Sequence, residues 1–195
     1  MGVVVYVLVD VVLQLLPPHY SLVSEAESNL AVGPFGWIMN LNFLGRAATT
    51  LSAVVAIGLS GPGSAVRRIG LALVTVAALS SAVLAFLPTD VPPADDPGLQ
   101  AVTAIGATHL VVATLGFLAA LAGFAVLTVW LRGSPELSAA YVGALALTAT
   151  AAGGLLSLGL AAAWAPTLLG LAERVCLAGI LGWVFVVCGA VRRLR

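Results

Sequence analysis

One histidine and several carboxylates interrupt stretches of this sequence that are otherwise apolar, and these are the residues that could do chemistry. His109 is followed, along one helix face, by the small residues Ala113, Gly116, Ala120 and Gly123. Small residues mark the faces on which helices pack inside a membrane, so we expect the imidazole to point into a helix bundle. On that helix it would lie ~12 Å below the outer surface.

The polar residues predict one pocket that opens to the outer side. A carboxylate facing lipid is costly, so Glu173 should turn inward. Arg174 is rotated ~100° from Glu173 on a helix, toward headgroups or Asp90. The alternatives are a satisfied packing network and a catalytic site. The candidate residues lie at similar depth on four apolar stretches, and they are Asn40, Asn42, Asp90, His109, Glu173 and Arg174.

Two opposite charges fall inside the first two apolar stretches. Asp10 would lie ~12 Å from the cytoplasmic side and Arg46 ~16 Å below the outer boundary, so their depths nearly coincide. An unpaired charge at such depth costs several kcal/mol. We therefore predict an intramembrane ion pair between Asp10 and Arg46. A gating or proton-coupling role for the pair, and an Arg46 that reaches lipid headgroups, are the alternatives.

The sequence predicts no cofactor, no metal ligand and no assigned catalytic residue. A haem held by two histidines would need both on facing helices, but His19, the other histidine, follows the first apolar stretch in a polar segment. Zinc could be held by His19, Asp90, His109 and Glu173, yet no short-range pair of ligands supports such a site. A triad of Ser28, His109 and Asp90 can also be drawn, as in any multi-span protein.

The composition excludes a water-soluble domain and a nucleic-acid partner. The 195 residues are 61% hydrophobic and 8% charged, with a formal net charge of zero. Soluble domains carry roughly 25% charged residues, so this chain lacks the charges to coat a surface in water. All its basic residues are arginines, and none forms a tract that could neutralise phosphates.

Six apolar stretches predict an all-α bundle of about six transmembrane helices in a single domain, residues 1–195. A hydrocarbon core of ~30 Å needs about 20 residues of helix. The first stretch is shorter, so it should lie upright, thin the bilayer, or lack residues upstream. The stretches lie near 2–16, 35–59, 69–87, 101–131, 139–163 and 168–191.

The loop charges predict that both termini are cytoplasmic. Arginines follow the second, fourth and sixth stretches, at Arg67–Arg68, Arg132 and the chain end. Cytoplasmic loops carry such an excess of basic residues, so the remaining loops face outward. The outward loops hold the acidic residues Glu25, Glu27, Asp90, Asp95 and Asp96.

The order of several short motifs supports a family resemblance over nearly the whole chain. The motifs are Tyr20-Ser21, Ser28-Asn29-Leu30, Gly36-Trp37-Ile38-Met39-Asn40, Phe43, Phe86-Leu87-Pro88-Thr89-Asp90, His109, Leu171-Ala172-Glu173-Arg174-Val175 and Trp183. In this order they resemble domain-of-unknown-function family 998, small six-span membrane proteins of bacteria and archaea. The resemblance implies a multi-pass protein of the prokaryotic cytoplasmic membrane, without an established activity. An apolar residue is usual in the family at Arg46, so this charge is a departure.

The leading functional prediction is non-enzymatic. We expect the outward pocket to bind or pass a small or lipid-like molecule taken from the bilayer. A membrane-embedded lipid hydrolase that uses His109 with acidic partners is the first alternative. An accessory subunit of a larger membrane complex, with a membrane protein as its partner, is the second.

Overall fold

The computed structural model describes residues 1–17, 20–61, 63–93 and 98–194. His19, Asp95 and Asp96, which entered the predictions above, lie outside these ranges. The described residues form helices and turns without a β-sheet, so the predicted all-α membrane bundle is confirmed. Within these described ranges, five helices are long and apolar enough to cross a membrane. They are α2 (Gly36–Gly58), α3 (Ala65–Leu84), α4 (Ala104–Arg132), α5 (Tyr141–Trp164) and α6 (Leu169–Arg192).

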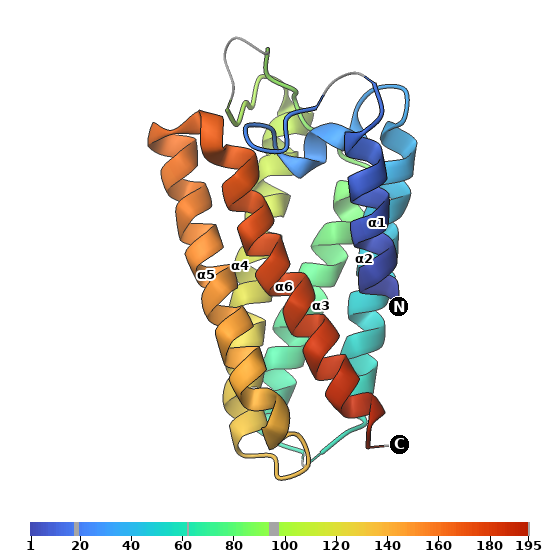
Figure 1. Cartoon of the computed structure of the whole chain (residues 1–195), viewed down its shortest axis with the longest axis vertical. Helices are drawn as coiled ribbons and strands as arrows, with labels where there is room; N and C mark the ends of the chain where they lie inside the picture. The colour runs from blue at the N-terminus through green and yellow to red at the C-terminus, as the bar shows by residue number, and fades with distance from the viewer. Residues whose placement is uncertain (18–19, 62, 94–97, 195) are drawn as a thin grey trace.

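The helix α1 (Gly2–Gln14) is shorter than these five. Its 13 residues extend about 20 Å, less than the ~30 Å of a hydrocarbon core. It packs beside α2 at the end of the bundle drawn uppermost in Figure 1, called the upper end below. Its first residue, Gly2, lies against Thr49 in the middle of α2. The N-terminus therefore lies at mid-height, whereas the C-terminus lies at the lower end (Figure 1).

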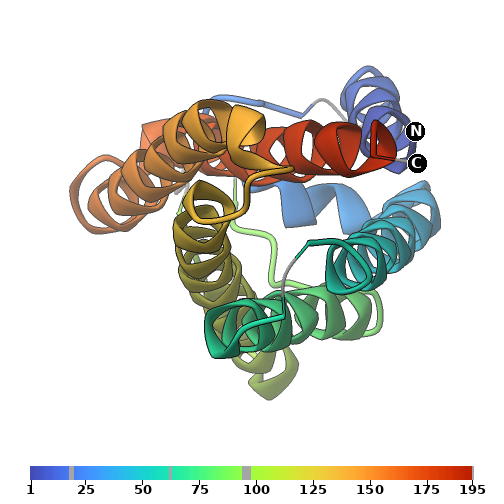
Figure 2. The ribbon, with the colours of Figure 1, turned by 90° about the horizontal axis from the view of Figure 1, so that it is seen from below.

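The helices surround an interior that is covered at the upper end. Neighbours along the chain pack against each other from α2 to α4, and α5 packs along α6. Figures 1 and 2 show α6 crossing the bundle diagonally and α5 diverging from α4 toward the upper end. A short 3-10 helix, η1 (Glu27–Ala31), covers this wider end and contacts α1, α2 and α6.

The ends of α3 and α4 follow from local hydrogen bonds. Ser64 Oγ accepts a hydrogen bond from the backbone N–H of Arg67 (3.1 Å), which satisfies an orphan donor of the first turn. For this reason α3 begins at Ala65, a few residues before the apolar stretch predicted near 69. Thr103 caps α4 in the same way, through the N–H of Gly106.

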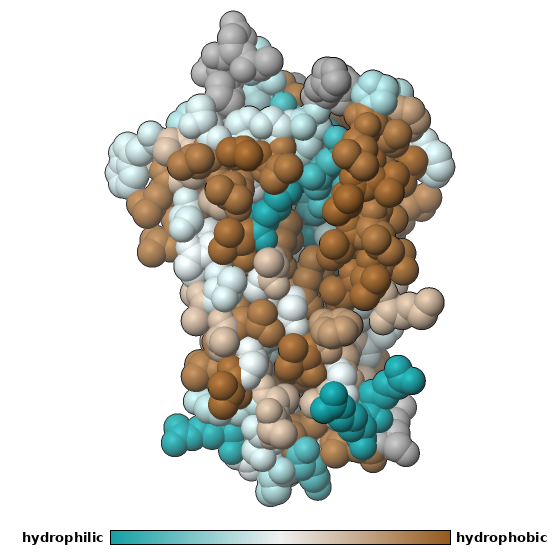
Figure 3. Space-filling model, viewed as in Figure 1, coloured by the Kyte–Doolittle hydropathy of each residue, from teal (hydrophilic) through white to brown (hydrophobic). Residues whose placement is uncertain are grey.

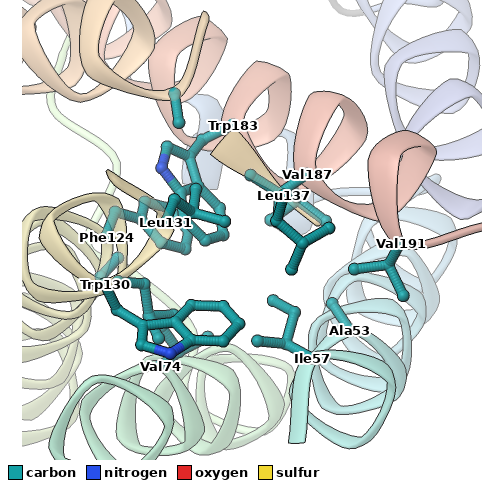
Figure 4. Packing of buried hydrophobic residues seen from close by; sticks show 14 residues of the cluster. Ala53, Ile57, Val74, Phe124, Trp130, Leu131, Leu137, Trp183, Val187 and Val191 are labelled. Atoms are coloured by element: carbon teal, nitrogen blue, oxygen red, sulfur yellow. The ribbon is translucent and has the colours of Figure 1, made fainter. Parts of the chain in front are cut away.

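The lower half of the bundle is a packed apolar core (Figure 4). The rings of Phe124 and Trp183 stack with centroids 4.3 Å apart. The indole N–H of Trp183 donates to Thr128 Oγ1 (2.9 Å), so the polar part of this side chain is satisfied inside the core. Val187 lies beside the two rings, and Ile57 lies beside the ring of Trp130 in the same cluster (Figure 4).

The outer surface fits a lipid environment. Large apolar side chains are exposed on all six helices. In Figure 3 hydrophilic residues gather at the lower end and in one hollow of the upper half, beside the apolar surface of α1. This is the architecture of a multi-pass membrane protein.

Candidate functional site

The most deeply buried carboxylate near the upper end belongs to Glu27, the first residue of η1. The residue is 4% exposed. The phenol of Tyr6, on α1, donates a hydrogen bond to Glu27 Oε2 (2.7 Å). The same oxygen lies 3.7 Å from Arg46 Nη1 on α2. A connecting segment thus carries a charge into the bundle and sets it against an arginine.

Arg46 is held by side chains from three helices. Its Nη1 donates to Tyr6 Oη (2.9 Å), and its Nε donates to Ser81 Oγ on α3 (2.8 Å). Ser81 in turn donates to the backbone oxygen of Phe43 (2.9 Å). The guanidinium also lies over the rings of Tyr6 and Phe43, 5.2 and 5.0 Å from their centroids. Such contacts favour a cation that has lost its water.

The predicted ion pair between Asp10 and Arg46 is wrong, because each charge has a different partner. Asp10 Oδ1 lies 3.9 Å from Arg174 Nη2 on α6, and Gln14 Nε2 donates to Asp10 Oδ2 (2.6 Å). Arg46 faces Glu27 instead. The prediction paired the two residues because they lie at a similar depth along the membrane normal. Depth does not determine on which side of α1 a neighbouring helix lies.

Glu173, on α6, is joined to η1. The backbone N–H of Glu27 donates to Glu173 Oε2 (2.6 Å), and the Glu173 side chain is 8% exposed. The start of α6 lies so close to this segment that a Cβ on Gly170 would be 2.3 Å from the backbone oxygen of Glu25. The backbone N–H of Leu171 also donates to Val23 O (3.0 Å). The segment before η1 and the first turns of α6 therefore form one packed unit.

Arg174 turns away from Glu173 and closes the space between α6 and α1. Its Nη2 donates to Tyr20 Oη (2.8 Å), and the Tyr20 phenol donates to the backbone oxygen of Glu25 (2.8 Å). Burial raises the pKa of this phenol well above its ordinary value. The hydrophilic hollow in Figure 3 lies between these helices.

His109 is 2% exposed, and its Nδ1 lies 2.6 Å from the backbone oxygen of Leu87. A carbonyl can only accept, so in the neutral imidazole Nδ1 carries the proton and Nε2 is an acceptor. Among the described residues Nε2 has no hydrogen-bond partner. Asp90 is occupied elsewhere, since the N–H and the hydroxyl of Thr103 donate to its two oxygens (2.8 and 2.9 Å). These bonds, led by the backbone N–H of Thr103, hold the Asp90 pKa below its usual range.

A cavity of about 80 Å³ lies beneath η1 and is lined by residues of η1 and of α2 to α6. Four charged or titratable side chains belong to its lining, namely Glu27, Arg46, His109 and Glu173. The rest of the lining is mainly apolar and comes from α2 to α6 and the α3–α4 connection, with Phe43, Leu84, Leu99, Leu110, Phe117, Leu158 and Leu169.

Two of the six predicted pocket residues line this cavity, His109 and Glu173. Asn42 is buried but donates to the backbone oxygen of Tyr6 (3.0 Å). Asn40, half-buried on α2, is not part of the lining. The residues predicted to share one pocket therefore lie in different places: His109 and Glu173 line the cavity, Asp90 caps α4, and Arg174 lies in the hollow beside α1.

Sequence reasoning missed Glu27 and the place of Arg46 in the lining. The sequence places Glu27 in an outward loop, because nothing in the surrounding residues distinguishes it from Glu25 two positions earlier. Arg46 also borders a second cavity of about 70 Å³, which extends toward Gly2 and Phe124. Arg46 therefore lines both cavities. Among the described residues no group of three or more His, Cys, Asp or Glu side chains is placed to hold a metal ion.

We expect stability to depend on pH through Glu27. Burial raises the pKa of its carboxyl from 4.5 to about 7, so the folded chain holds a proton there that the unfolded chain releases. The contribution of Glu27 to the free energy of unfolding is fully present below about pH 4.5. It is lost, on the order of 3 kcal/mol, as pH rises through about 7. Glu27→Gln, which mimics the protonated form, should remove this fall in detergent-solubilised unfolding measurements. The same pH dependence in the variant would refute the assignment.

Comparison with known proteins adds a family and no relative of known activity. The sequence matches the family described as "Protein of unknown function (DUF998)" over residues 1–190. The family expected from the motifs is therefore confirmed. No curated protein and no solved structure matches the chain.

Proposed function

Because the chain belongs to the DUF998 family, whose description names no activity, we propose its function from the geometry inside the bundle. The protein binds an amphipathic, lipid-like molecule in the cavity beneath η1. One observation carries this proposal: the lining of the cavity combines four charged or titratable side chains, Glu27, Arg46, His109 and Glu173, with a surface that is otherwise mainly apolar. Binding sites for small molecules combine an apolar lining with a few placed polar groups in this way.

The splay of α5 from α4 supports entry from the bilayer. Figures 1 and 2 show the two helices diverging toward the upper end. Leu110 and Phe117 of α4 and Leu158 of α5 line the cavity while remaining half-buried. An apolar chain could therefore leave the lipid between α4 and α5 without crossing water.

The test uses single-chain amphiphiles with a ten-carbon tail, added to the purified protein in nanodiscs. At least one of decylamine, decyltrimethylammonium, decanol and decanoate should raise the unfolding temperature in a concentration-dependent way. Leu158→Trp, which fills the cavity, should abolish the shift. Leu156→Trp is the control, because Leu156 lies on the same helix and is 66% exposed. If no amphiphile stabilises the protein, or if both variants respond alike, the proposal fails.

We also place the upper end outside the cell. The arginines of the lower connections and of the end of α6 support this, as Arg67, Arg68, Arg132 and Arg192 all lie at the lower end. In a protein lacking Cys176 and Cys188, a cysteine at exposed Ser21 should react with an impermeant thiol reagent on intact cells. A cysteine at Glu136, exposed in the α4–α5 connection, should react only after lysis. Labelling of Glu136→Cys on intact cells would reverse the orientation.

A further inference from the structure

The charges around the cavity do not balance. Glu27 faces Arg46 and Asp10 faces Arg174, so within the described part of the chain the Glu173 carboxylate forms no ion pair of its own. Three carboxylates thus meet two guanidinium groups inside an apolar bundle. Buried charge is expensive unless it is compensated, so the cluster favours one further positive charge. A proton or a cationic ligand can supply it.

The unused polar atoms of the lining are mostly acceptors. Glu27 Oε2 and Glu173 Oε2 receive the hydrogen bonds described above, whereas each Oε1 has no partner among the described residues. His109 Nε2 is a third acceptor in the same lining. All three side chains are more than nine-tenths buried. None of the three is among the fully buried side-chain atoms that lack a partner in the described residues, so each reaches the open space of the cavity, where a ligand can bring N–H groups to it.

The cationic side of the lining is already engaged. Arg46 directs Nε at Ser81 and Nη1 at Tyr6, which leaves Nη2 as its remaining nitrogen. One free nitrogen on a guanidinium that already faces a carboxylate is a weak site for an anionic head group. A carboxylate or phosphate would also raise the negative charge of a cluster that already has an excess.

Building on the proposed function, we propose that the head group taken by this cavity is a primary ammonium carried on an apolar chain. An ammonium brings one positive charge, which the cluster lacks. It brings three N–H donors, and the lining offers the acceptors Glu27 Oε1, Glu173 Oε1 and His109 Nε2. The apolar part of the cavity takes the first carbons of the chain.

A proton and the ammonium should then exclude each other. Burial raises the pKa of Glu27 to about 7, and a proton there removes the excess negative charge. Tyr6 from α1, Arg46 from α2 and Glu173 from α6 contact Glu27 directly, and His109 from α4 is a further titratable group of the same cavity lining. Protonation of Glu27, Glu173 or His109 weakens the attraction for a cation in each case. The affinity for the ammonium should therefore rise as pH rises through about 7.

The experiment compares the four ten-carbon amphiphiles by their dissociation constants on the intact protein in nanodiscs. Decylamine should bind about tenfold more tightly than decyltrimethylammonium, which has the charge without the N–H donors, and about 100-fold more tightly than decanol. Glu173→Gln should weaken decylamine about tenfold or more and leave decanol unchanged. Glu25→Gln is the matched control, since the Glu25 side chain does not line this cavity.

The outcomes separate this inference from the proposed function. If decanol or decanoate binds as tightly as decylamine, and Leu158→Trp abolishes that binding, the cavity remains a binding site and the ammonium is wrong. Equal affinity for decylamine and decyltrimethylammonium would overturn the match of donors and acceptors. If none of the four binds, both proposals fall. Should Glu173→Gln not fold, Glu27→Gln tests the same loss of charge.

Discussion

Replacing Arg46 with glutamine should destabilise the folded protein by about 3–5 kcal/mol, because one partner of a buried ion pair is removed. The change removes the donors to Tyr6 and Ser81 and leaves the Glu27 carboxylate without its cation. The loss should be larger at about pH 8 than at about pH 5, since Glu27 is protonated at the lower pH. Denaturant unfolding in mixed micelles measures it.

Two further variants make the Arg46 prediction specific. Arg68→Gln changes the same residue type at an exposed position of α3, and surface changes of this kind stay within about 0.5 kcal/mol. The double variant Arg46→Gln with Glu27→Gln should recover much of the loss, because the unmatched carboxylate is gone. If the double variant is no more stable than the sum of the single effects allows, the two side chains are not coupled.

Gly154→Ala is expected to have the second large effect, through the contact of α5 with α6. A Cβ at Gly154 would lie 2.2 Å from the backbone nitrogen of Cys176. On the facing helix, a Cβ at Gly179 would lie 2.4 Å from the backbone nitrogen of Ala151. Both obstacles are backbone atoms, so the helices must separate to admit a single methyl group. Overpacking of this kind costs about 1–3 kcal/mol or more.

The neighbouring glycine provides the control for this prediction. Gly153 is exposed on the same helix, and a Cβ there would meet nothing within 4 Å. Gly153→Ala should therefore leave the unfolding free energy unchanged or raise it slightly. If Gly153→Ala and Gly154→Ala destabilise the protein equally, then the close approach of α5 and α6 does not depend on Gly154.

The helices could be predicted from the sequence because their length and composition are set by the bilayer. An apolar stretch of about 20 residues has few other stable structures, and the ends of α2, α4, α5 and α6 fall close to the predicted limits. The short first helix was predicted for the same reason. These are properties of single segments, which a linear sequence displays directly.

The site was predicted only in part, because it depends on which faces of the helices pack against each other. The inward direction of His109 and Glu173 followed from small residues and from the cost of charge in lipid. The partners of Asp10 and Arg46 did not follow, since depth fixes one coordinate and leaves the angle around the helix open. The burial of Glu27 could not be predicted for another reason. Its connecting segment folds back into the bundle, and no periodic pattern in the sequence indicates this fold-back.

The location of Glu27 on a connection rather than on a spanning helix bears on how the chain is assembled during synthesis. Asp10, Glu27 and Arg46 leave the ribosome early, while Glu173 and Arg174 follow near the end of the chain. Arg46 enters the bilayer with α2, and Glu27 can reach it only by folding back from the surface. Tyr6 and Arg46 can hold the Glu27 carboxylate once α1 and α2 are in place, and Glu173 then adds a hydrogen bond to the Glu27 backbone. Insertion of α6 therefore adds a further contact to a fold-back that neutralises a charge placed in the membrane by α2.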